Sequence, residues 1–174
     1  MFRFVNIAFL LVAGLFISTL ALSFAQADTF APPKGDAILT VTGAITATNS
    51  ADALVLDLAQ LEALPQHSFT TSTTWTEGTS TFQGVLLKDL IAAVGATGAT
   101  VNMTALNDYV ISMPTADAKD DGPLLAYLMD GKTMSVRDKG PLWVVYPYDD
   151  NADYRTEESY SRSIWQLARV EFVK

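Results

Sequence analysis

The sequence predicts an α+β fold made mostly of short β-strands with a few small helices. Apolar and polar residues alternate in short segments from residue 37 to the C-terminus, as they do in half-buried strands. Gly, Pro, Asn-Asp and Asp-Gly separate these segments. Because 49% of the 174 residues are apolar and 17% are charged, the composition is that of one globular domain, which we place at residues 37–174.

The first half of this domain contains strands, one helical turn and one helix. Residues 37–45 alternate and predict a strand, and residues 53–65 combine a short strand with a helical turn that ends at Pro65. The hydroxyl-rich residues 67–76 predict the next strand. After residues 80–85, a helix is expected at 86–94, because its apolar residues recur at helical spacing and Gly95 follows them.

The second half is expected to be almost entirely strands. Two of them, 99–106 and 108–114, are separated by the turn pair Asn107-Asp108. Residues 122–134 predict a buried strand or a short helix, followed by a turn at Asp130-Gly131. Two more strands are expected at 140–147 and 163–174.

An acidic segment lies between the last two predicted strands. Residues 148–158 hold five carboxylates, and Tyr154 stands where a calcium-binding loop would need Gly. We therefore expect a mobile acidic loop, either a lid over a pocket or a surface that faces a partner.

The N-terminus predicts a cleavable signal peptide at residues 1–27. It has a basic residue at Arg3, an uncharged apolar run over 7–24, and Ala25-Gln26-Ala27 before the expected cleavage point. The alternative is an uncleaved membrane anchor, since the apolar run approaches the length that spans a bilayer. We expect cleavage, a periplasmic location and a flexible lead-in over residues 28–36, which contains Pro and Gly.

Composition argues against several classes of function. The formal net charge of −8 makes nucleic acid an improbable partner. The chain has no cysteine, so it forms no disulfide and performs no thiolate chemistry. His67 is the only histidine, which argues against a zinc site built from several histidines.

Five segments in a fixed order resemble the sulfite-oxidase-like molybdopterin-binding fold. They are FQGVLLKDLI (82–91), LNDYVISMP (106–114), LLAYLMDGKTM (124–134), KGPLWVVYP (139–147) and SIWQLARVEF (163–172). The resemblance covers roughly residues 37–174. It implies an α+β domain with a pocket for a pterin cofactor, in which Tyr109 matches the active-site tyrosine of the family.

The sequence departs from that family where the enzymes carry the cysteine that binds molybdenum. The corresponding segment, TTSTTWTEGTSTFQG (70–84), has only hydroxyl side chains as donors of comparable size. Hydroxyls are hard donors and do not replace a thiolate at a sulfur-rich metal centre. Outside the signal peptide there are four arginines to hold a phosphorylated cofactor: Arg137, Arg155, Arg162 and Arg169. We therefore expect no molybdenum and no catalysis.

A smaller group within the fold is more similar still. The sequence closely resembles exported, cysteine-less pterin-binding proteins that carry T-x-W-T, A-L-N-D-Y and S-I-W-Q-L. This resemblance implies a sensor or adaptor that binds a free neopterin- or monapterin-like pterin. The implied partner is the periplasmic part of a membrane-anchored diguanylate cyclase/phosphodiesterase. The alternatives are a molybdopterin-dependent oxidoreductase and a ligand-free interaction domain that kept only the fold.

Seven residues are candidates for pterin binding. A pterin offers flat faces that stack on aromatic rings and an edge that a carboxylate can bind through two parallel hydrogen bonds. We expect rings for stacking, an acid and a tyrosine for the edge, and polar groups for the hydroxylated tail or the carbonyl. The candidates are Trp75, Thr76, Asp108, Tyr109, Arg162, Ser163 and Trp165.

Each candidate also has a structural alternative. Trp75 and Trp165 could simply pack in the core, where we also expect Trp143. Asp108 and Tyr109 could be a turn acid followed by a strand aromatic. Arg162 and Ser163 could be ordinary surface residues.

Overall fold

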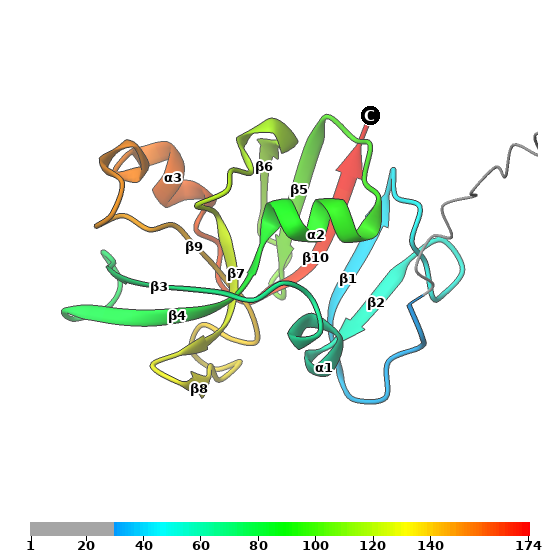
Figure 1. Ribbon diagram of the computed structural model, residues 1–174, viewed down its shortest axis with the longest axis horizontal. Coiled ribbons are helices and arrows are strands. Elements are labelled where there is room, and N and C mark those ends of the chain that lie inside the picture. The colour runs from blue at the N-terminus through cyan, green and yellow to red at the C-terminus, as the bar shows by residue number, and fades with distance from the viewer. Residues whose placement is uncertain (1–29) are drawn as a thin grey trace, which may run out of the picture.

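Two β-sheets form the framework of the domain in the computed structural model, which describes residues 30–174 (Figure 1). The first sheet has the order β2 (Leu54–Asp57), β1 (Ala37–Gly43), β10 (Leu167–Val173), β5 (Thr100–Ala105), β6 (Val110–Pro114). The second has the order β3 (His67–Ser72), β4 (Thr79–Leu86), β7 (Leu124–Met129), β8 (Lys132–Thr133), and β9 (Trp143–Val145) also pairs with β7. The predicted α+β fold is confirmed. The predicted signal peptide lies outside the described residues.

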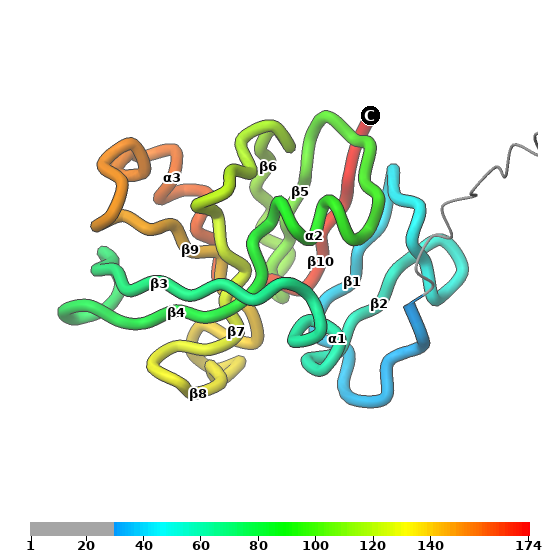
Figure 2. Tube along the Cα trace, viewed as in Figure 1, coloured from blue at the N-terminus to red at the C-terminus, as the bar shows by residue number. Residues whose placement is uncertain are grey.

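The two ends of the domain meet in the middle of the first sheet. Strands β1 and β10 run parallel, with Thr40 opposite Arg169 and Gly43 opposite Phe172, and Figure 2 shows them side by side. A Cβ at Gly43 would lie 2.1 Å from the Phe172 carbonyl oxygen. The close approach of the two backbones therefore requires glycine at this position.

Helices α1 (Leu58–Glu62) and α2 (Leu87–Val94) lie where the sequence predicts them. Asp57 caps α1, because its Oδ1 accepts a hydrogen bond from the Gln60 N–H at 2.9 Å while the Gln60 side chain accepts from the Asp57 N–H at 3.1 Å. Helix α2 ends at Gly95, which has a left-handed backbone with φ of 59°. Among residues 30–174, no helix combines the length and the apolar character needed to cross a bilayer.

The acidic segment 148–158 is ordered, contrary to the mobile loop expected from the sequence. It contains a 3-10 turn, Ala152–Tyr154, and the start of a third helix, α3 (Glu157–Arg162). The Thr156 hydroxyl caps α3 by accepting from the Ser159 N–H at 3.2 Å. Residues 148–158 therefore belong to the folded domain and contain regular secondary structure.

Part of the predicted flexible lead-in is also held in place. The N–H groups of Lys34 and Gly35 each donate to Asp57 Oδ2 at 2.8 Å. The Ala31 carbonyl accepts from the side-chain amides of Asn49 and Gln60. Hydrogen bonds between the backbone of residues 31–35 and side chains of the domain therefore hold this segment in place. The Pro- and Gly-containing composition of the segment does not predict these bonds.

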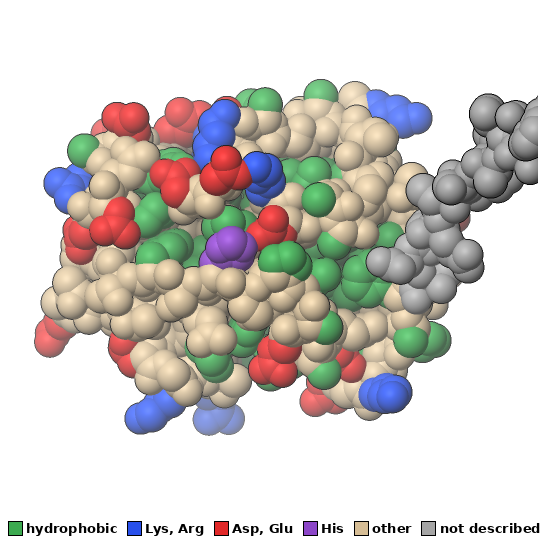
Figure 3. Space-filling model, viewed as in Figure 1, with side chains coloured by type: hydrophobic (Ala, Val, Ile, Leu, Met, Phe, Trp, Pro, Cys, Tyr) green, Lys and Arg blue, Asp and Glu red, His purple; other side chains and the backbone are tan. Residues whose placement is uncertain are grey.

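His67 links β3 to α2. Its Nε2 lies 2.7 Å from Asp89 Oδ2, and Figure 3 shows the single histidine beside an acidic side chain on the molecular surface. The histidine thus connects two elements of the fold through a contact between their side chains.

Asp57 connects the lead-in, β2 and α1, so it provides a test of this arrangement. Hydrogen bonds from the N–H groups of Gly35, Gln60 and Lys34 lower the pKa of its carboxyl group. Because the folded-state pKa is lowered, the stabilisation is complete above the ordinary Asp pKa of about 3.9 and is lost as the pH falls below it. We expect Asp57→Asn to lower the thermal unfolding midpoint at pH 7 by a few degrees. The difference from wild type should shrink as the pH approaches 3.

Circular dichroism melts over this pH range measure the effect. Asp52→Asn is the matched control, because Asp52 is an exposed carboxylate nearby. An Asp57→Asn deficit that stays constant down to pH 3 would contradict the assignment of charge-dependent bonds to Asp57.

Candidate functional site

Trp75 lies at the centre of a cluster of aromatic rings. It occupies the turn between β3 and β4, is half-buried, and contacts three other rings edge-on. The centroid distances are 6.0 Å to Trp143, 5.8 Å to Trp165 and 6.1 Å to Tyr160, with interplanar angles of 69°, 72° and 81°. Edge-to-face geometry of this kind is preferred by aromatic pairs. The cluster brings together the β3–β4 turn, β9, α3 and the segment before β10.

Backbone bonds attach the segment before β10 to the second sheet. Trp143 of β9 forms an isolated bridge with Trp165. The Val144 N–H donates to the Ile164 carbonyl at 2.9 Å, and the Trp143 indole N–H donates to the Ser163 carbonyl at 3.1 Å. Since β10 itself belongs to the first sheet, these bonds join the two sheets and fix the position of Trp165.

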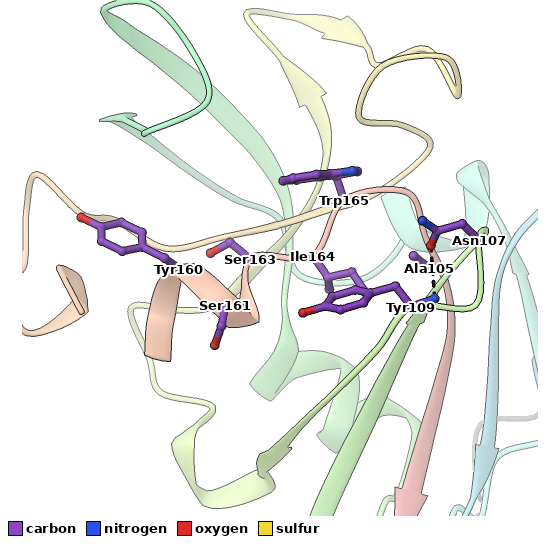
Figure 4. A pocket seen from close by; sticks show the side chains of 8 residues that line it. All are labelled: Ala105, Asn107, Tyr109, Tyr160, Ser161, Ser163, Ile164 and Trp165. Carbon is purple, nitrogen blue, oxygen red and sulfur yellow. Dashed lines mark hydrogen bonds between the residues drawn. The ribbon is translucent and has the colours of Figure 1, made fainter. Parts of the chain in front are cut away.

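A pocket of about 340 Å³ opens beside this junction. In Figure 4 the Trp165 ring lies on one side of the pocket and the Tyr109 ring on the opposite side. These two aromatic side chains are unusually exposed, Tyr109 by 54% and Trp165 by 37%. The lining residues are Ala105, Asn107, Tyr109, Tyr160, Ser161, Ser163, Ile164 and Trp165.

Asn107 provides an amide at the edge of the pocket. Its Oδ1 accepts a hydrogen bond from the Tyr109 N–H at 3.1 Å, drawn in Figure 4. This bond orients the side chain and leaves its NH₂ group as a donor to a ligand. The sequence predicts Asn107 only as a turn residue. It lies, however, within A-L-N-D-Y, one of the motifs that resemble the exported pterin-binding proteins.

Asp108 does not line the pocket. Its backbone has a left-handed φ of 65°, which Asp tolerates better than most residues. Its carboxylate accepts a hydrogen bond from Arg169 Nη2 at 2.5 Å. The structure therefore places Tyr109 at the pocket. Asp108, which we expected to bind the ligand edge together with Tyr109, is paired instead with Arg169 of β10.

Arg162 is also engaged elsewhere. Its guanidinium donates to Asp117 Oδ2 at 3.0 Å and pairs with Glu158 one turn earlier in α3. The side chain is 14% exposed and is not among those that line the pocket. Its two carboxylate partners offset its charge, so it is poorly suited to bind an anionic ligand.

Ser163 lines the pocket, but its hydroxyl is already bonded. It donates to the Ser159 carbonyl at 2.7 Å and accepts from the Tyr148 hydroxyl. Burial raises the pKa of Tyr148 to about 12, so this phenol stays protonated and acts as the donor. Ser163 thus supports the end of α3.

Thr76 takes part in the turn that positions Trp75. The hydroxyls of Thr73 and Thr76 lie 2.8 Å apart, and the Trp75 N–H donates to Thr73 Oγ1 at 3.1 Å. Neither Trp75 nor Thr76 lines the pocket, although Trp75 contacts two rings that do. Trp143 is fully buried, as predicted.

A cation lies against the aromatic cluster. Lys139 Nζ is 4.9 Å from the centroid of the Trp165 ring and 5.3 Å from that of Trp143. Its side chain is 17% exposed, and Asp138 lies 3.7 Å from the ammonium. The cation–π contact restrains Trp165 against the second sheet.

The fold and the pocket define a class: an α+β domain with an aromatic-walled cavity beside the junction of its two sheets. Residues 37–149 match the oxidoreductase molybdopterin binding domain, and the chain belongs to this family. No curated protein shows a significant match to the chain.

A solved structure with the same fold is the sulfane dehydrogenase SoxCD from Paracoccus pantotrophus. The TM-score is 0.57 at 17% sequence identity, and the match covers 78% of this chain and 37% of that chain. This chain thus spans little more than a third of the SoxCD chain. The likeness establishes the shared fold and confirms the sulfite-oxidase-like architecture expected from the sequence.

The donor atoms of this chain do not fit a thiolate-anchored molybdenum centre. The sequence has no cysteine, and the β3–β4 hairpin offers Thr and Ser, two of which bond each other in the turn at Trp75. Within the described part of the chain, no three His, Cys, Asp or Glu side chains are grouped as metal ligands would be. The aromatic walls suit the flat ring of a pterin, but within residues 30–174 the hairpin offers no soft donor to bind its metal.

The two tryptophans that form the bridge are expected to contribute differently to stability. Trp143→Ala should lower the free energy of unfolding by about 3–5 kcal/mol, because it leaves a cavity at a fully buried site. Trp165→Ala should lower it by about 1 kcal/mol, since much of that ring is exposed. Urea unfolding followed by circular dichroism compares the two variants. Equal losses would show that Trp165 is a core residue and not a pocket wall.

Proposed function

We propose that the domain binds a free reduced pterin, without catalysis, in the pocket between Tyr109 and Trp165. One observation carries the proposal: two exposed aromatic rings face each other across a cavity in a cysteine-less chain of a molybdopterin-binding family. Exposed apolar surface is unfavourable in water, so rings left open at a pocket are explained by a flat ligand that covers them.

The chemistry of the pocket suits a bicyclic heterocycle. Its volume of about 340 Å³ is within the range of small-molecule sites. Each aromatic contact with the ligand would contribute about 0.5–1.5 kcal/mol beyond the area that it buries. The Asn107 amide, oriented by the Tyr109 N–H, would complement the polar edge of the ring.

We extend the proposal to signalling in the periplasm. The predicted signal peptide supports export, and the resemblance to exported pterin-binding proteins supports a role as sensor or adaptor. The proposed partner is the periplasmic part of a membrane-anchored diguanylate cyclase/phosphodiesterase. Pterin binding can bias that partner only by the difference in its affinity for the bound and empty forms of the domain.

Membership of the family raises oxidoreductase activity as the alternative. Such activity would need a molybdenum centre held without cysteine, and the hydroxyl-rich hairpin supplies no soft donor for it. Metal analysis of protein purified from the periplasm separates the two functions. Stoichiometric molybdenum would support the enzyme and overturn the non-catalytic proposal.

Ligand binding can be tested through the two ring walls. We expect Tyr109→Ala and Trp165→Ala each to weaken neopterin binding about tenfold, because each removes one stacking surface together with the area it buries. Isothermal titration calorimetry measures the affinity, and mass spectrometry identifies any pterin that copurifies with the wild type.

Val136→Ala is the matched control, because Val136 is 53% exposed but does not line the pocket. The assignment of the site fails if both ring variants bind neopterin as tightly as Val136→Ala does.

The proposed partner can be tested with the purified periplasmic domain of such a membrane protein from the same organism. Saturating neopterin should change its affinity for this domain by about tenfold, equivalent to about 1.4 kcal/mol of coupling. Biolayer interferometry with and without neopterin measures the change, and Trp165→Ala should reduce it. Identical affinities in both conditions would exclude a reporting role toward that partner.

A further inference from the structure

A second cavity lies on the other side of Tyr160. It has a volume of about 340 Å³ and includes the start of the β3–β4 turn, Tyr148, Asp149 and Arg155 among its lining. Tyr160 lines both cavities, and Trp75 packs edge-on against its ring. The two cavities are therefore neighbours across a single aromatic side chain.

We propose that this second cavity binds the neutral, hydroxylated side chain of a ligand whose ring occupies the first cavity. The proposal rests on the proposed pterin-binding function and extends it to the chemical class of the tail. A tail that carries hydroxyls is selected, and a tail that ends in phosphate is rejected.

The Asp149 carboxylate is the main acceptor in the second cavity. The Ser72 N–H and hydroxyl donate to its two oxygens at 2.5 and 2.7 Å and fix its orientation. These bonds lower the pKa of Asp149, so the group is ionised at neutral pH. Each carboxylate oxygen keeps a free lone pair, and the side chain is 36% exposed. Hydrogen bonds from ligand hydroxyls to a carboxylate are stronger than those to a neutral acceptor.

The positive charge in the cavity is already neutralised. Arg155 Nε donates to the Tyr148 carbonyl at 2.6 Å and Nη2 to the Asp149 carbonyl at 3.3 Å, while Nη2 lies 3.7 Å from Asp149 Oδ1. The surrounding segment 148–158 holds five carboxylates and only this one basic residue. A phosphate, with a charge of about −1.5 to −2 at neutral pH, would meet net repulsion here.

Hydroxyl side chains complete the lining. Ser72, Thr73 and Thr74 project around the β3–β4 turn and border the cavity. Thr73 is used within the turn, where it accepts from the Trp75 N–H. Thr74 is exposed and borders the cavity, so it can meet a ligand hydroxyl. The cavity thus presents neutral hydroxyls, one fixed carboxylate and the Arg155 guanidinium that lies against this carboxylate.

Three probes separate recognition of the ring from recognition of the tail: 6-methylpterin, neopterin and neopterin monophosphate. Calorimetric titration of the full mature protein should give neopterin about tenfold tighter than 6-methylpterin, because only neopterin donates to Asp149. Neopterin monophosphate should bind more weakly than neopterin, and raising the salt concentration should narrow that gap.

Asp149→Asn should abolish most of the preference for neopterin while 6-methylpterin binds as in wild type. Glu157→Gln is the matched control, because it removes the same charge from the same segment outside the cavity. Thr74→Val, at an exposed position, provides a second variant should Asp149→Asn unfold, and it should reduce the preference for neopterin severalfold.

The outcomes distinguish the two proposals. If neither 6-methylpterin nor neopterin binds, the pterin-binding function fails, and the tail site with it. Binding of 6-methylpterin with no gain for neopterin overturns the tail site alone. The tail site is also overturned if the monophosphate binds more tightly than neopterin, or if Asp149→Asn and Thr74→Val keep the full preference.

Discussion

The pairing of Trp143 with Trp165 is the constraint on which the rest of the site depends. Trp143 belongs to β9 of the second sheet. Trp165 lies in the segment that leads directly into β10, the central strand of the first sheet. Because backbone bonds make this connection, Trp165 cannot turn into the core without breaking the junction between the sheets. The exposure of its ring is therefore imposed by the fold.

Trp75 occupies the hairpin region where enzymes of this fold are expected to carry their metal-binding cysteine. Its ring braces Trp165 and Tyr160 from one side, and Lys139 restrains Trp165 through its charge. The hydroxyls of Thr73 and Thr76 are used in the turn, which leaves these two groups little freedom to bind an incoming group. In this chain the β3–β4 turn supports two of the aromatic side chains that line the pocket.

Most strands and two helices could be predicted, because alternating apolar residues and a terminal glycine mark them locally. Helix α3 could not, since its sequence EESYSR buries only Ser159 and shows no apolar stripe. Helix α3 also carries Tyr160, a pocket residue that the sequence did not indicate, and Arg162, which pairs with Asp117. The direction of the Asp108 side chain could not be predicted for a different reason, because it depends on a left-handed turn and on a bond to distant Arg169.

The parallel pairing of β1 with β10 has a consequence for how the chain acquires its structure. The central strand of the first sheet, β10, follows the other four strands along the chain, so β1–β2 and β5–β6 remain two separate hairpins until β10 has been synthesised. Contacts between such distant residues form late and slowly. Until β10 pairs with both of them, β1 and β5 each expose an unpaired edge, so the first sheet can complete its hydrogen bonding only after every strand of the second sheet has been synthesised.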